Sequence, residues 1–197
     1  MLTRYMAWAN DRIFAAVATL PEGEATKPRR SVFKNIVHTL NHVYVIDLIF
    51  QAHLEGREHG FTAHNTPDYP PLDDLRDKQR ALDDWYIAWS DRLTEPELER
   101  KVHFTFVGGG EGALTCAEIV MHLANHTTYH RGYIADMLYQ VPANPPTTDL
   151  TVFLRDAPEA RLIRARVAAP AWRPLYAAQR PPIRCGFKTR GPSQAMR

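Results

Sequence analysis

The sequence predicts an all-α fold, a four-helix bundle with a short β-hairpin or strand before the last long helix. Four long segments repeat apolar residues at intervals of three and four, the period of a helix with one buried face. A shorter segment, residues 100–107, alternates apolar and polar residues and then meets three consecutive glycines, which favours a strand and a turn. Four helices of this kind can bury their apolar faces against one another in a bundle.

The first two helices are predicted over residues 2–20 and 31–54. Pro21 ends the first apolar repeat, because proline has no amide hydrogen to continue a helix. Ser31 can cap the second helix, which ends at Gly56. Since this second helix is apolar on most of its faces, we expect it to be central in the bundle.

The other two long helices are predicted over residues 72–93 and 115–138. A long loop rich in proline precedes the third helix. Thr115 and Glu118 have the spacing of a capping box at the start of the fourth. After further prolines that break the chain, residues 149–155 are predicted to form one or two additional helical turns.

Residues 157–197 differ in composition from the predicted bundle over residues 1–156. They contain nine Lys or Arg, one acidic residue and six Pro, so their formal net charge is +8 in a chain whose total is +2. The density of proline and the absence of periodicity predict a basic, Pro-rich and poorly ordered extension. Such an extension can bind nucleic acid or another acidic partner, although the balanced charge of the whole chain argues against nucleic acid.

The composition excludes several classes of protein. Hydrophobic residues make up 45% of the chain and charged residues 23%, as in ordinary globular domains. No apolar run approaches the roughly 20 residues of a membrane-spanning helix, and the first residues lack the apolar core of a signal peptide. We therefore expect no membrane partner and a cytoplasmic location. The two cysteines, Cys116 and Cys185, cannot form a disulfide framework or a thiolate zinc cluster.

Nine histidines are the unusual feature, and His122, His126 and His130 follow one another four residues apart in the last long helix. Residues four apart lie on adjacent turns of one helix face. His126 and His130 fall within or beside the apolar stripe, so they can bind one metal ion together or form a hydrogen-bonded pair in the core. A third ligand must come from another helix, and spacing alone allows either His38 or His42.

Four motifs resemble those of the DinB family and occur in the same order along the chain. Residues 5–10 read Tyr-x-x-Trp-Ala-Asn, residues 39–47 read TLNHVYVID, residues 122–134 read HLANHTTYHRGYI, and residues 148–156 read TDLTVFLRD. The family has a His five positions before an Asp in its second helix, and His-x-x-x-His-Arg-Gly in its last helix. The resemblance extends over about residues 2–156 and leaves out the basic extension.

This resemblance implies a DinB/YfiT-like bundle in which His42, His126 and His130 bind one divalent transition metal ion. Three histidines leave an open coordination position, and zinc, nickel and iron all accept imidazole ligands. The resemblance favours a metal-dependent hydrolase or a thiol S-transferase, in which water or a low-molecular-weight thiol takes the open position. It also implies a homodimer, and the family name refers to damage induction.

Two other functions fit the same residues. The chain could be a non-catalytic, stress-related metal-binding bundle, or a binder of nucleic acid or acidic partners that uses its basic extension. The sequence shows no recognisable catalytic triad, phosphate-binding loop or carboxylate pair. Asp47 could orient a ligand histidine or make a hydrogen bond inside the bundle. Cys116 could have a lowered pKa at the positive end of the last helix, although a core position is favoured.

Overall fold

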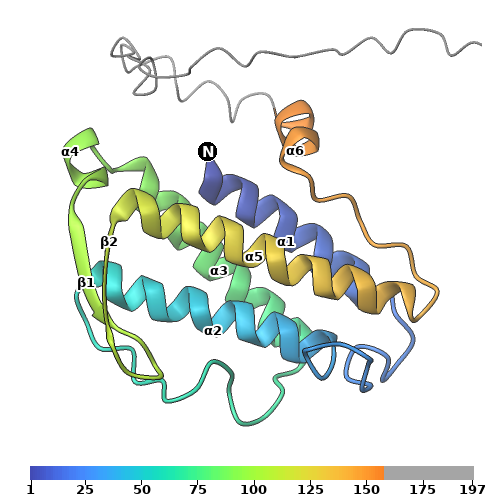
Figure 1. The fold of residues 1–197 in the computed structure, drawn as a ribbon. Helices are drawn as coiled ribbons and strands as arrows, with labels where there is room; N and C mark the ends of the chain where they lie inside the picture. Colours follow the sequence, from blue (N-terminus) through green and yellow to red (C-terminus); the bar gives the residue numbers. More distant parts are fainter. Residues whose placement is uncertain (158–197) are drawn as a thin grey trace, which may run out of the picture. The chain divides into compact units, whose positions relative to one another are not determined.

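The computed structural model describes residues 1–157 and confirms the all-α bundle (Figure 1). The four long helices are α1 (Leu2–Ala18), α2 (Ile36–Glu55), α3 (Leu72–Asp91) and α5 (Cys116–Tyr139). The remaining elements are α4 (Glu95–Leu98), β1 (Lys101–Thr105), β2 (Glu111–Thr115) and α6 (Leu150–Asp156). Apart from Ala157, the predicted basic extension lies outside the described residues. No helix in the described part of the chain is long and apolar enough to cross a membrane.

The four long helices pack in the order α1, α3, α2 and α5 around the bundle. The main contacts join α1 to α3 and α5, and α2 to the same two helices, so α1 and α2 lie at diagonal corners. An apolar cluster that includes Phe50 and Leu123 fills the end near the hairpin, and another that includes Ile36 and Ile134 fills the opposite end.

A layer of buried polar side chains separates the two apolar clusters. Along α1, Asn10 lies between Met6 of one cluster and Ile13 of the other, and the other three long helices show the same order. The polar members of this layer are Asn10, Asp47, Gln79, Asp83, Thr127, His130 and Arg131. Because buried polar groups need partners, this layer is where the helices exchange side-chain hydrogen bonds.

The second helix begins later than the sequence predicts. Its N-cap is Asn35 rather than Ser31, and Oδ1 of Asn35 accepts a hydrogen bond from the backbone N of His38 at 2.7 Å. Nδ2 of Asn35 also donates to the backbone O of Thr26, which holds the cap on its outer side. Phe33 therefore lies outside the helix, and its ring packs against histidines instead of occupying a position in the helical repeat.

The strand and glycine run form the predicted hairpin. Strands β1 and β2 pair antiparallel, starting with Lys101 opposite Thr115. Gly109 and Gly110 have φ values of 88° and 90°, a region that glycine enters without steric cost, and they make the turn. Phe104 points from β1 into the apolar cluster at that end of the bundle. The four-residue helix α4, which precedes the hairpin, was not predicted.

The closing segment is anchored to the first helix. Phe153 of α6 packs on Tyr5 and Trp8, with ring centroids 5.7 and 5.5 Å away. The hydroxyl of Tyr5 also donates a hydrogen bond to the backbone O of Thr148 at 2.9 Å. The aromatic residues near the start of the chain therefore hold its far end against α1.

Candidate metal centre

Three histidine side chains meet where α2 packs against α5. His42 comes from α2, whereas His126 and His130 come from adjacent turns of α5. Nε2 of His126 lies 2.9 Å from Nε2 of His130 and 3.3 Å from Nε2 of His42. One ring nitrogen from each residue lies within 4.8 Å of the other two, so the cluster could hold one metal ion.

The separations between these nitrogens fit a shared ion. Zinc binds imidazole nitrogen at about 2.0–2.1 Å, so two such ligands are about 3.3 Å apart at the tetrahedral angle and about 2.9 Å apart at a right angle. The two measured Nε2 separations, 3.3 and 2.9 Å, correspond to these values. Without a cation, the lone pairs of neutral rings would face one another unless a proton lay between them.

The backbone carbonyl of His64 fixes the ring of His42. Its oxygen lies 3.0 Å from Nδ1 of His42, and because a carbonyl can only accept, Nδ1 carries the proton and Nε2 the lone pair. Asn41 holds this loop, since its Oδ1 accepts hydrogen bonds from Nδ2 of Asn65 and from the backbone N and Oγ1 of Thr66. The loop runs along α2 (Figure 1), so one candidate ligand is oriented before any ion binds.

Burial keeps the three rings neutral at physiological pH. Desolvation, followed by the charges of neighbouring histidines, lowers the pKa of His126 to about 3. Desolvation, followed by His42, lowers the pKa of His130 to about 4. The pKa of His42 is also lowered, chiefly by burial. A neutral imidazole has a lone pair for a cation, so burial prepares these rings to act as ligands.

Aromatic rings form a wall beside the cluster. The ring centroid of Phe33 lies 4.8 Å from that of His130 and 5.3 Å from that of His42. Tyr133 lies 5.4 Å from Phe33, and its hydroxyl is 2.7 Å from the hydroxyl of Tyr129. An apolar wall lowers the local dielectric and strengthens the attraction between an ion and its ligands.

Other sequence candidates do not join the cluster. The rings of His38 and His122 lie beside aromatic side chains instead. Asp47 does not orient His42, because it makes the alternative contact inside the bundle, where its Oδ2 accepts a hydrogen bond from Nε2 of Gln79 at 3.0 Å. The reason is helical geometry, since five residues along a helix rotate a side chain by about 140°.

Cys116 is a core residue. Its side chain is fully buried in the apolar cluster near the hairpin. Burial raises the pKa of its thiol, so the lowered pKa considered for this helix terminus is wrong. The cost of placing a thiolate in an apolar cluster exceeds the stabilisation by the helix end.

Two residues of the site escaped sequence analysis. His64 contributes its backbone carbonyl, a group that every residue has, so its sequence carries no sign of this role. Phe33 was included in the predicted second helix, and only the position of the Asn35 cap places its ring beside the histidines. Neither contact has a local sequence pattern, because both depend on how loops return to the bundle.

The fold and the site define a four-helix-bundle protein with a histidine cluster that could bind a metal ion. The family model described as DinB family matches residues 1–164, and the chain belongs to this family. It is similar to the protein DinB of Bacillus subtilis (strain 168), with 29% identity over 164 residues that cover 78% of this chain and 91% of the relative. The resemblance seen in the four sequence motifs is thereby confirmed.

Proposed function

We propose that this chain binds one divalent transition metal ion through His42, His126 and His130, and that it is a metal-dependent hydrolase or thiol S-transferase. The convergence of three neutral Nε2 atoms at the interface of α2 and α5 carries this proposal. Zinc, nickel and iron are the candidates, because each accepts a ligand set made only of imidazole nitrogens.

The bound ion supplies a Lewis acid with an open position, which lowers the pKa of water or of a thiol. The surrounding residues prepare that position. The carbonyl of His64 keeps the lone pair of His42 directed at the cluster. Phe33 packs over His130 and His42 and keeps water from that side of the rings. The open position is therefore expected on the side of the cluster away from Phe33.

Metal content tests the ligand assignment directly. We expect elemental analysis of protein purified without a histidine tag to find about one zinc, nickel or iron per chain. His126→Ala is expected to lose this metal. His122→Ala is the matched control, because His122 lies one turn away on the same helix and packs on Phe50 rather than in the cluster. Wild-type protein that holds no metal and cannot be reloaded would contradict the proposal.

Activity distinguishes an enzyme from a non-catalytic metal-binding bundle. Metal-loaded wild type is expected to turn over a substrate from panels of esters and low-molecular-weight thiol acceptors. The activity should disappear in His126→Ala and persist in His122→Ala. Retained metal without turnover across both panels would favour the non-catalytic, stress-related function. A salt-sensitive interaction that is lost when residues 158–197 are deleted would favour the partner-binding function instead.

The homodimer and the cytoplasmic location remain predictions. Light scattering on the eluting peak of a sizing column would test the dimer. Exposed large side chains on α5 identify one surface where a second copy could pack, and they are Met121, Tyr129 and Tyr139.

A further inference from the structure

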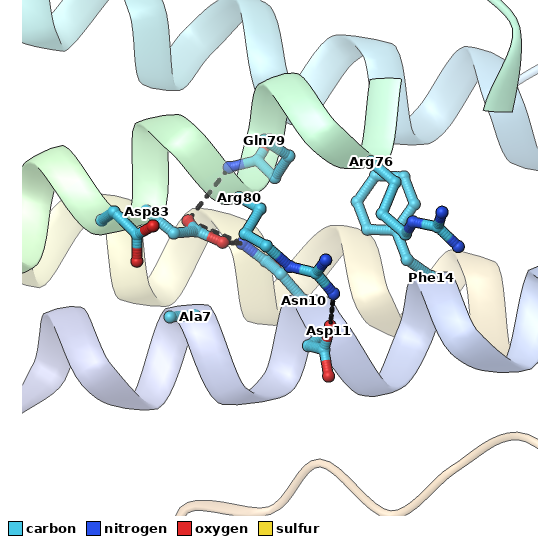
Figure 2. Close-up of a pocket in the computed structure, with 9 residues that line it drawn as sticks. Ala7, Asn10, Asp11, Phe14, Arg76, Gln79, Arg80 and Asp83 are labelled. Carbon is cyan, nitrogen blue, oxygen red and sulfur yellow. Dashed lines mark hydrogen bonds and ion pairs between the residues drawn. The ribbon is translucent and has the colours of Figure 1, made fainter. Parts of the chain in front are cut away.

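A second polar site lies on the other side of the buried polar layer, between α1 and α3. A cleft of about 310 Å³ opens there (Figure 2). Its buried floor and exposed rim contain Asn10, Gln79, Asp83, Asp11, Arg80 and Asp84. None of these residues belongs to the histidine cluster.

Asp83 is the central group of the floor. Its side chain is only 5% exposed, and Nδ2 of Asn10 lies 3.1 Å from both of its carboxyl oxygens. Nε2 of Gln79 lies 3.1 Å from one of them, and Figure 2 shows the two amides approaching Asp83 from α1 and α3. Amides supply hydrogen bonds but no positive charge. Burial therefore raises the pKa of Asp83 to about 7, and a positively charged ligand would relieve this cost.

Gln79 gives a second and independent indication of a ligand. Its side chain is 1% exposed, and its Nε2 also donates to Oδ2 of Asp47, so the nitrogen faces two carboxyl groups. The oxygen Oε1 of Gln79 is then left without a hydrogen-bond partner among residues 1–157. A buried carbonyl oxygen without a donor is uncommon in folded proteins. The floor of the cleft therefore lacks a hydrogen-bond donor as well as a positive charge.

The existing arginines do not supply that charge. Arg80 pairs with Asp11 at the rim, and Arg76 pairs with carboxylates on its own helix. Arg131 of α5 is close enough to lower the pKa of Asp83, but its hydrogen bonds go to hydroxyl groups of α1 and α5. Asp84, exposed at the rim, makes no ion pair within the described part of the chain. The cleft thus keeps unpaired negative charge at both floor and rim.

We propose that this cleft binds a ligand that carries a primary ammonium group. Three N–H donors match three acceptors, namely the carboxylate of Asp83, Oε1 of Gln79 and the carboxylate of Asp84. A divalent metal ion fits poorly, because Asp83 already accepts three hydrogen bonds and hard cations require about six oxygen ligands. Both simple amines and amino acids have this ammonium group, and an amino acid could also place its carboxylate near Arg80.

Calorimetric titration of metal-free, full-length protein with ethylamine, glycine and acetate tests the proposal. We expect ethylamine or glycine to bind and acetate not to bind. Asp83→Asn, which keeps the shape of the side chain, should weaken binding by at least about tenfold. Because this substitution is buried, Asp84→Asn at the exposed rim provides a second test and should also weaken binding. Asp136→Asn, an exposed change on α5 outside the cleft, should leave it unchanged.

A further control separates this site from the metal centre. Amines can also coordinate metal ions, so the titration is repeated with His126→Ala, in which ammonium binding is expected to persist. Tighter binding of glycine than of ethylamine would identify an amino acid as the ligand class, and the reverse order would identify a simple amine. Absence of binding at millimolar concentrations, equal binding by folded Asp83→Asn and Asp84→Asn, or loss of binding in His126→Ala would overturn the proposal.

Discussion

The histidine cluster between α2 and α5 and the cleft between α1 and α3 belong to one buried polar layer, yet burial shifts their pKa values in opposite directions. Burial lowers the pKa of His126 to about 3 and raises the pKa of Asp83 to about 7. In both regions the apolar surroundings favour the neutral form of the side chain. A neutral imidazole offers its lone pair to a metal ion, whereas a neutral carboxyl group can exchange its proton for a cation. One physical cause therefore prepares two sites for two kinds of cation.

The largest expected effect is stabilisation by metal, confined to the histidine side. Zinc at about a thousandfold excess over its dissociation constant should add about 4 kcal/mol to the free energy of unfolding. Denaturant unfolding with and without zinc measures this gain. It should vanish in His126→Ala and remain in both His122→Ala and Asp83→Asn. A gain of equal size in His126→Ala would show that zinc binds elsewhere, and the comparison between the two regions would fail.

A smaller effect is expected from Asn41, which acts on the metal centre only through the loop. Asn41→Ala removes three hydrogen bonds that hold Asn65 and Thr66, so the His64 carbonyl should lose its fixed position. Loss of such a supporting contact weakens metal binding by about 10- to 100-fold. Competition with a chromogenic chelator measures the metal dissociation constant.

The matched control for Asn41 is Asn125→Ala, an exposed asparagine that directly precedes His126. This variant should bind metal as the wild type does. Both variants should bind ethylamine equally well, because the cleft between α1 and α3 does not involve the loop. If Asn41→Ala kept the wild-type metal dissociation constant, the loop would have no part in orienting His42.

The smallest expected effect is a change in the pH dependence of stability of metal-free protein. The pKa of Asp83 is about 7 in the folded chain against a model value of 3.8. Between these values the folded state binds a proton that the unfolded state does not, so this contribution to stability falls as pH rises. His126, with a pKa lowered from 6.5 to about 3, contributes in the opposite sense, because its stability is lost as pH falls below 6.5.

Asp83→Asn removes the falling contribution. Between about pH 4 and 6.5 the free energy of unfolding should therefore rise more steeply with pH in this variant than in the wild type, by up to about 1.4 kcal/mol per pH unit. Denaturant unfolding at a series of pH values, with a chelator present, provides the slopes. Asp136→Asn serves as the exposed control and should keep the wild-type slope. Parallel curves for Asp83→Asn and wild type would mean that Asp83 is ionised throughout.

Most of the fold could be predicted because its helices have local patterns. The apolar repeat identified all four long helices, and the spacing of Thr115 and Glu118 predicted the capping box that begins α5. The start of α2 was wrong by five residues' worth of chain, since Asn35 rather than Ser31 makes the capping hydrogen bond. Two polar residues so close together are equivalent as caps in the sequence, and only the returning chain at Thr26 distinguishes them.

The sequence by itself determined that His126 and His130 lie on one face of one helix, because a spacing of four is a property of the helix alone. It left His38 and His42 as equal partners, and the resemblance to a family selected His42. Only the tertiary structure brought His42 to within 3.3 Å of His126 and set the carbonyl of His64 behind it.

The cleft between α1 and α3 depended on tertiary structure altogether. Asn10 and Asp83 are 73 positions apart, and Asp47 and Gln79 are 32 apart. Periodicity describes one helix at a time and says which face is apolar, whereas a contact between helices also depends on their relative rotation and shift along their axes. These are decided when the two apolar clusters pack, and that packing places the four polar side chains together in the layer between them.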